Sequence, residues 1–178
     1  VIYYYFAKNG YDDLINLDKL WIIDINLEKV KSALNSKYWI VLIAGPTWSW
    51  KSTTLFSTLK YFNPLEYNIS TLEDPIEYNM EYVNQSQIKP EIWYTFASWL
   101  RSLVRQDPDI IMVWEIRDKE TALLSIESAL TWHLVLSTIH TNSASWTIHR
   151  LINMWIETFL IASALKMIIS QRLIKKLC

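Results

Sequence analysis

The residues with the clearest chemistry lie in the stretch 40–57, which reads IVLIAGPTWSWKSTTLFS. An apolar run ends at Gly45, and Lys51 and Ser52 follow at the start of an amphipathic segment. This order predicts a strand, a loop and a helix, and backbone N–H groups at such a helix N-terminus bind phosphate oxygens. In a loop of this kind the lysine reaches the β- and γ-phosphates and the hydroxyl ligates Mg²⁺. The stretch therefore predicts a site for ATP and Mg²⁺.

One position departs from the phosphate-loop pattern G-x-x-x-x-G-K-[ST]. Trp50 stands where the second glycine is expected, and Trp48 precedes it by two residues. Glycine is used there because the backbone must pass close to a phosphate. We expect the whole loop to contact the nucleotide. Its residues are Gly45, Pro46, Thr47, Trp48, Ser49, Trp50, Lys51, Ser52 and Thr53.

Three later stretches carry further motifs. Residues 71–78 read TLEDPIEY, residues 95–118 contain TFASWLRS and MVWEIRD, and residues 131–142 read TWHLVLSTIHTN. Together with the loop they resemble the secretion ATPases of type II secretion and type IV pilus assembly, over about residues 20–178. In that family the corresponding segments read GPTGSGKST, TFASGLRS, MVGEIRD and TGHLVLSTLHTN. Every tryptophan in these stretches stands where the family has glycine.

Composition indicates one cause for these tryptophans. An ordinary chain of this length holds roughly 12 glycines, whereas this one has 2 Gly and 10 Trp. The resemblance implies glycine at the remaining tryptophans as well, which are Trp21, Trp39, Trp93, Trp146 and Trp155. We hypothesise that the gene uses UGA as a glycine codon and that the sequence shows it translated as tryptophan. The alternative is a decayed paralogue that does not bind nucleotide, although decay would scatter substitutions over many residue types.

Length, charge and apolar content restrict the class of protein. The 178 residues suit one domain plus a remnant of another. A net charge of −1 and a pI of about 6.3 give no electrostatic case for nucleic acid. The longest apolar stretch near the end, 159–169, contains Lys166 and is too short to span a bilayer. The single cysteine argues against a disulfide scaffold and fits a reducing compartment.

We expect two unequal parts. Residues 1–25 are interpreted as the tail of a preceding N-terminal domain and a linker, and residues 26–178 as a RecA-like ATPase domain. The segment 1–6, VIYYYF, is typical of a strand cut from its sheet, so further protein is expected before it. At the other end, the resemblance places Cys178 where assembly and secretion members begin a four-cysteine zinc insertion. Retraction motors lack that insertion, which favours extension or secretion.

Apolar periodicity predicts alternating strands and helices. Helices are expected at 27–34, 52–62, 95–106, 118–130, 145–154 and 157–176, and strands at 40–44, 68–72, 82–88, 110–113 and 133–138. The last helix carries a Leu/Ile/Met stripe that is expected to face the core. This alternation predicts an α/β fold of the RecA-like P-loop NTPase type, with a parallel sheet and helices on both faces.

Two glutamates at expected strand ends are the candidates for acting on water. Glu73 follows the strand at 68–72, at the edge where open α/β sheets bind ligands. The resemblance implies that Glu73 positions water or metal, although acidic residues before a proline are also ordinary turn formers. The resemblance makes Glu115, after the strand at 110–113, the residue that polarises the attacking water and contacts Mg²⁺ through water.

Two arginines and three histidines complete the candidates. Arg101 and Arg105 lie four residues apart and are expected on one helical face. Such a pair is commonly a solvated basic face, whereas the resemblance makes it a candidate to meet the γ-phosphate across a subunit boundary. Among the histidines, the resemblance favours His140 over His133 as the sensor of the γ-phosphate. His149 is expected at the surface, and the three lack metal-site spacing.

The resemblance implies a cytoplasmic motor subunit that hydrolyses ATP with Mg²⁺ to power pilus assembly or type II protein secretion. It also implies a homohexamer at the inner face of the cytoplasmic membrane, with an inner-membrane platform protein as partner and without nucleic acid or a transmembrane segment. Two alternatives stay open. One is a scaffold paralogue that cannot bind nucleotide, if Trp48 and Trp50 are genuine. The other is a retraction or DNA-transfer motor of the same superfamily, and the absence of a basic patch disfavours DNA transfer.

Overall fold

The computed structural model describes residues 16–20, 22, 24–36, 38–89, 91 and 94–173. The strand expected at 1–6 and Cys178 lie outside these residues. The helices are α1 (Asp24–Leu34), α2 (Lys51–Leu59), α3 (Phe96–Leu103), α4 (Lys119–Leu130), α5 (Ala144–Asn153) and α6 (Thr158–Ala164), with 3₁₀ turns η2 (Leu17–Lys19) and η4 (Val104–Gln106). The strands are β1 (Trp39–Ala44), β2 (Ile69–Glu73), β3 (Asn84–Gln87), β4 (Ile110–Val113), β5 (Leu134–Ile139) and β6 (Leu165–Ser170).

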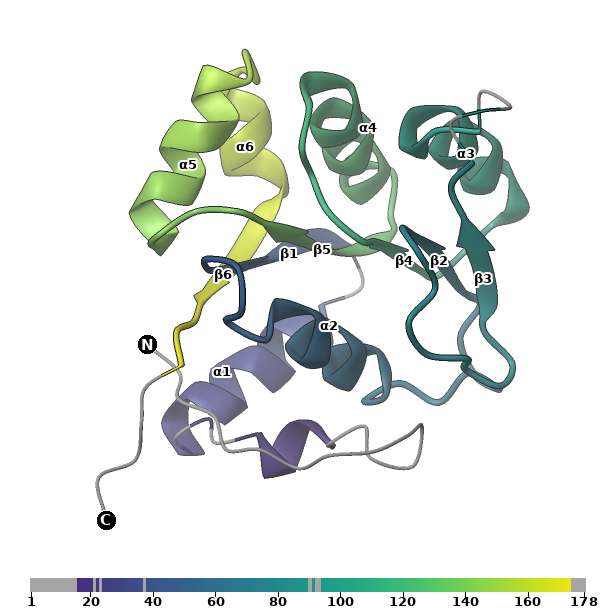
Figure 1. Ribbon diagram of the computed structural model, residues 1–178, viewed down its shortest axis with the longest axis horizontal. Coiled ribbons are helices and arrows are strands. Elements are labelled where there is room, and N and C mark those ends of the chain that lie inside the picture. The colour runs from purple at the N-terminus through teal and green to yellow at the C-terminus, as the bar shows by residue number, and fades with distance from the viewer. Residues whose placement is uncertain are drawn as a thin grey trace.

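The strands form one six-stranded parallel sheet in the order β3-β2-β4-β5-β1-β6. Helices α1 and α2 cover one face and helices α3 to α6 cover the other (Figure 1). Along β1, Val41 and Ile43 belong to the core beneath α1 and α2, whereas Ile40 and Leu42 belong to the opposite core. Burial on both faces explains why this strand is a continuous apolar run. The predicted α/β fold is confirmed.

Local signals set the starts of two helices. Thr95 caps α3, because its hydroxyl accepts from the Ser98 N–H while Ser98 Oγ accepts from the Thr95 N–H. Asp118 caps α4 by accepting from the Thr121 N–H at 2.8 Å. Both predicted starts are confirmed. The predicted continuous helix to residue 106 is only partly right, because α3 ends at residue 103 and continues as the 3₁₀ turn η4.

The prediction of one helix over 157–176 is wrong. Helix α6 is followed directly by β6, whose first residue, Leu165, already has extended backbone angles, φ −78° and ψ 113°. Strand β6 pairs in parallel with β1, and the β-branched side chains of Ile168 and Ile169 suit a strand. Pairing with a distant strand therefore outweighed the helical periodicity. Among the described residues, none of the helices has the length and apolar character needed to cross a bilayer.

Residues before α1 contribute to the same core. Leu17 and Leu20 are each 2% exposed and belong to the core cluster beneath α1 and α2. Helix α1 begins at Asp24, slightly earlier than expected, and the rest of its predicted span is confirmed. The part of the linker that the structure describes is therefore packed on the domain. The division into residues 1–25 and 26–178 stays a prediction.

Candidate active site

The loop between β1 and α2 is folded around its own carbonyl groups. Lys51 Nζ donates to the carbonyl oxygens of Gly45 and Pro46, each at 3.0 Å, and Ser49 Oγ donates to that of Pro46 at 2.7 Å. A Cβ at Gly45 would stand 2.4 Å from Ser49 Oγ and 2.7 Å from the Gln171 carbonyl oxygen. Position 45 therefore requires glycine. The result is a tight turn at a helix N-terminus, the arrangement that binds phosphate.

The charge at this loop also suits a triphosphate. Lys51 is only 9% exposed, and burial lowers the pKa of its ammonium, an effect that the nearby charge of Glu115 opposes. A partly desolvated cation gains from an anionic ligand, because its attraction to that ligand is poorly screened. Ser52 and Thr53 are half-buried at the start of α2. In a phosphate loop, the hydroxyl at the position of Ser52 would be the ligand of Mg²⁺.

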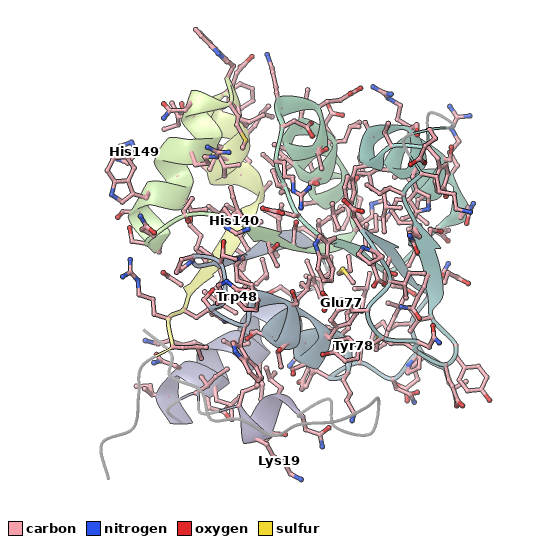
Figure 2. The ribbon with its side chains drawn as sticks, in the orientation of Figure 1. Lys19, Trp48, Glu77, Tyr78, His140 and His149 are labelled. Atoms are coloured by element: carbon pink, nitrogen blue, oxygen red, sulfur yellow. The ribbon has the colours of Figure 1, made fainter. Side chains whose placement is uncertain are left out.

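The backbone at four tryptophans has the conformation that favours glycine. Of the six non-glycine residues with positive φ in the described part of the chain, four are tryptophans: Trp48 (63°), Trp50 (66°), Trp132 (75°) and Trp155 (61°). For a bulky residue this conformation costs on the order of 1–3 kcal/mol. Trp48 is 88% exposed in the loop between β1 and α2 (Figure 2). This is the backbone conformation that the glycine hypothesis predicts at these four positions.

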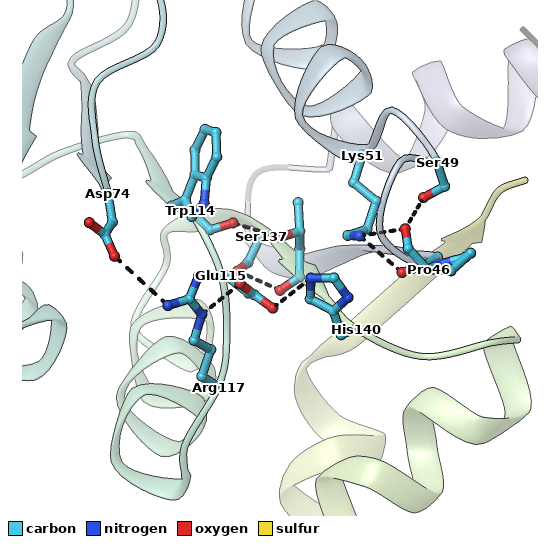
Figure 3. A network of polar contacts seen from close by, with 11 residues as sticks. Pro46, Ser49, Lys51, Asp74, Trp114, Glu115, Arg117, Ser137 and His140 are labelled. Carbon is cyan, nitrogen blue, oxygen red and sulfur yellow. Dashed lines mark hydrogen bonds and ion pairs between the residues drawn. The ribbon is translucent and has the colours of Figure 1, made fainter. Parts of the chain in front are cut away.

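Glu115 is the centre of a polar network whose residues follow the ends of three strands, β2, β4 and β5 (Figure 3). Its carboxylate, after β4, is 6% exposed and accepts from Arg117 Nε at 2.7 Å. Its other oxygen lies 3.3 Å from Nε2 of His140, which follows β5. The Arg117 guanidinium also lies 3.8 Å from Asp74 Oδ2, after β2. The carboxyl ends of neighbouring parallel strands thus meet at one edge of the sheet.

The surroundings of His140 disfavour the protonated imidazole. Burial lowers the pKa of the imidazole below its usual value of 6.5, and the charge of Lys51 lowers it further, while Glu115 opposes both. A neutral imidazole has one donor and one acceptor nitrogen. A neutral His140 can therefore donate one hydrogen bond, either to a phosphate oxygen or to Glu115.

Glu73 belongs to a second network. It is fully buried, and its Oε1 accepts from Thr71 Oγ1 at 2.7 Å and from Gln85 Nε2 at 2.8 Å. Burial raises the pKa of the Glu73 carboxyl, and these two hydrogen bonds oppose the rise. Among the described residues, no hydrogen bond or ion pair joins Glu73 to Glu115 or Lys51. The two predicted glutamates therefore have different surroundings.

The two predicted arginines do not reach this site within the chain. Arg101, on α3, forms an ion pair with Glu120 of α4, and both side chains are more than half exposed. Arg105 is exposed in η4, so the two arginines do not share one continuous α-helix as expected. Both remain candidates for contacts outside their own chain.

The other two histidines lie apart from the network. His133 is buried, and its Nδ1 lies 2.8 Å from the Ser128 carbonyl oxygen. His149 is exposed on the outer side of α5 and packs against the Trp146 ring, as the surface prediction requires (Figure 2). Within the part of the chain that the structure covers, no three His, Cys, Asp or Glu side chains gather into a metal-binding group.

Sequence reasoning assigned no role to three residues of the site: Arg117, Asp74 and Gln171. Arg117 follows Glu115 by two positions, and alternate residues of an extended backbone face the same side, so this pair could have been inferred. Asp74 joins them only because β2 and β4 are neighbours in the sheet. Gln171 contacts Ser49 of the loop, 122 positions earlier in the chain, and no local sequence pattern predicts that contact.

Comparisons with known proteins show which family the chain resembles. The family model described as type II/IV secretion system protein matches residues 7–178. The type IV pilus assembly ATPase PilB of Myxococcus xanthus is 53% identical over 148 residues, 83% of this chain and 26% of PilB. The type II secretion system protein E of Dickeya dadantii is 45% identical over 164 residues, 92% of this chain and 33% of that protein. The chain thus spans about a quarter to a third of these relatives.

Solved structures show the same fold. The pilus retraction motor PilT with bound ADP superposes with a TM-score of 0.79 at 39% identity, over 89% of this chain and 48% of PilT. The ATPase DotB of Legionella pneumophila gives a TM-score of 0.77 at 29% identity, over 89% of this chain and 46% of DotB. With the family model covering nearly the whole sequence, the chain belongs to the type II/IV secretion system protein family.

Proposed function

We propose that the chain is the ATP-hydrolysing core of a motor subunit that powers pilus assembly or type II protein secretion. The observation that carries this proposal is that Lys51, Glu115 and His140 lie together beside the phosphate loop. In that loop, position 45 has room only for glycine. The names of the relatives support the choice of assembly and secretion, since PilB and protein E are 53% and 45% identical and the retraction motor PilT is 39% identical.

Each residue has a distinct part in this reaction. Lys51 and the N–H groups at the start of α2 bind the phosphates. Glu115 orients and polarises the attacking water, and Arg117 fixes its carboxylate through the 2.7 Å hydrogen bond. His140, whose Nε2 lies 3.3 Å from Glu115, would contact the γ-phosphate. Ser52, and Glu115 through water, would hold Mg²⁺, which would supply positive charge to the phosphates.

Substitutions at Lys51 and Glu115 separate binding from hydrolysis. We expect Glu115→Gln to bind MgATP but to hydrolyse it about 10²-fold more slowly or worse, the scale of lost acid–base assistance. Lys51→Ala should instead weaken MgATP binding. Glu127→Gln, an exposed carboxylate of α4, is the control and should change neither. Hydrolysis by Glu115→Gln at the parent rate would exclude the role assigned to this carboxylate.

The same proposal covers the oligomeric state of the protein and its location in the cell. We infer a homohexamer at the cytoplasmic side of the inner membrane, with a platform protein of the pilus or secretion system as partner. Arg101 and Arg105 would then complete the site of a neighbouring subunit, and their exposure leaves them available for that contact. The scaffold alternative requires genuine tryptophans at positions 48 and 50, where positive φ disfavours them.

A further inference from the structure

Gln171 is a fully buried polar residue outside every motif assigned above. It follows β6, and its backbone N–H donates to the Ala44 carbonyl oxygen at 2.9 Å. Its side-chain Nε2 donates to the Ser49 carbonyl oxygen, and its Oε1 accepts from Thr54 Oγ1 at 2.9 Å. One residue thus holds the chain before the phosphate loop, within it and in the first turn of α2.

The contact with Ser49 fixes the direction of a peptide group in the loop. In a trans peptide the C=O and N–H point in opposite directions. Because Gln171 binds the Ser49 carbonyl, the N–H of residue 50 points away from Gln171. Residue 50 directly precedes Lys51 and is the N-cap of α2, so its orientation determines how the helix N-terminus begins.

The same residue restricts the other end of the loop. Its carbonyl oxygen lies 2.7 Å from where a Cβ at Gly45 would stand. Thr54 is fully buried, so its hydroxyl depends on partners inside the protein. The loop is therefore shaped between β1 on one side and Gln171 on the other. The contacts of Gln171 with Ser49 and Thr54 depend on the pairing of β6 with β1, because that pairing places Gln171 beside the loop.

We propose that Gln171 is a positioning residue that holds the phosphate loop in its binding shape before any nucleotide arrives. It does not touch the reacting atoms, since its side chain is engaged with Ser49 and Thr54. The consequence for ATP rests on the proposed function, whereas the positioning itself is a property of the chain alone. A loop shaped in advance binds its ligand at a smaller cost in ordering.

Amide hydrogen exchange of the nucleotide-free chain tests the positioning. The experiment uses the ten-glycine form if the codons confirm the recoding, and the form as printed otherwise. Gln171→Met keeps the side-chain length and removes both polar contacts. We expect the amides of residues 49–54 to exchange about tenfold faster or more, while those of α3 and α4 keep their rates. Gln171→Glu should act in the same direction, because it places an acceptor against the Ser49 carbonyl oxygen.

Two controls match the loss of a contact without touching the loop. Arg172→Ala removes the neighbouring side chain, which donates to the Asn142 carbonyl oxygen at 3.3 Å. Ser128→Ala removes a buried hydrogen bond to the Leu124 carbonyl oxygen at 2.7 Å in α4. Neither should speed exchange at residues 49–54. If Gln171→Met does not fold, Thr54→Val removes the hydroxyl that donates to Gln171 Oε1 and, at 3.3 Å, to the Trp50 carbonyl oxygen, and it should loosen the same amides.

Nucleotide binding gives the second readout. A positioning role predicts that Gln171→Met weakens MgATP binding about tenfold while turnover at saturating ATP stays within about twofold of the parent. Unchanged exchange at residues 49–54 in a folded variant would overturn the proposal, as would equal acceleration of all amides. If the parent itself fails to bind MgATP, the proposed function fails, and the exchange result still decides the role of Gln171.

Discussion

At the residue scale, backbone conformation and side-chain identity disagree at the tryptophans. Trp50 has φ 66° at the N-cap of α2, and Trp48 has φ 63° in the same loop. Both conformations are favourable for glycine and strained for an indole-bearing residue. Trp146 differs, because it lies within α5, where glycine is a poor choice. Substitutions at Trp50 and Trp146 therefore test whether the positive φ strains the chain.

We predict that Trp50→Gly raises the free energy of unfolding by about 1–3 kcal/mol, through relief of the positive φ. Trp146→Gly should lower it by about 0.5–1 kcal/mol, because it adds glycine to a helix. Urea denaturation measures both. A loss of stability in Trp50→Gly would contradict the strain argument.

The gene provides the decisive measurement of the same hypothesis. If UGA encodes glycine, all ten tryptophan codons are TGA, and peptides from the native cell carry glycine at positions 48, 50, 114 and 132. TGG codons would reject the recoding and favour the scaffold alternative.

Glu73 should make stability depend on pH. Burial raises its pKa above the usual 4.5, so the folded state binds this proton more tightly than the unfolded state does. Stability therefore falls as the pH rises from about 4.5 through the raised pKa. We predict that Glu73→Gln stabilises the chain more at pH 7 than at pH 4.5, as urea denaturation would show. The exposed control Glu127→Gln should show no such difference. An equal effect of Glu73→Gln at both pH values would contradict the assignment.

At the scale of elements, β6 is the decisive feature because it completes the sheet and delivers Gln171. The Gln171 N–H donates to β1, and successive backbone N–H groups of a strand point to alternate sides. The Met167 N–H therefore points to β1 and the Ile168 N–H to the sheet edge. Both side chains are half-buried, so they form a matched pair.

We predict that Met167→Pro costs about 0.5–1.5 kcal/mol more than Ile168→Pro, because only the first removes a ladder hydrogen bond. Chemical denaturation of the two variants measures the difference. Equal losses, as expected for prolines within one helix, would exclude the strand.

At the scale of the whole molecule, Arg101 pairs with Glu120, whereas the ion-pair partners of Glu115 among the described residues are Arg117 and His140. An exposed ion pair of this kind contributes little to stability and can be exchanged for another anion. A guanidinium is well suited to phosphate oxygens. Arg101 is therefore our proposed residue for contact with the phosphate in a neighbouring subunit.

We predict recovery of ATPase activity when Arg101→Ala and Glu115→Gln subunits are co-assembled. Random mixing pairs an intact glutamate with an intact arginine at about a quarter of the interfaces, and an arginine acting in trans can serve those sites. Mixing Glu115→Gln with the double variant lacking both groups is the control and should stay inactive. No recovery in verified mixed rings would contradict the role in trans.

Much of this molecule was determined by the sequence itself. The apolar run into Gly45, the caps at Thr95 and Asp118, and the strand before Glu115 depend on hydrogen bonds and periodicities that span a few residues. Such signals remain visible in the one-dimensional chain, and they were sufficient to place the phosphate loop and the α/β alternation.

Only the tertiary structure decided the rest. Residues 165–170 form a strand because they pair with β1, although their apolar residues are spaced as in a helix. Asp74 joined Arg117 because β2 and β4 are neighbours, and Gln171 reached Ser49 across 122 positions. These contacts depend on strand order and on burial, whose energies come from groups far apart in the chain. A local pattern carries no information about them, so they emerge only when the sheet is assembled.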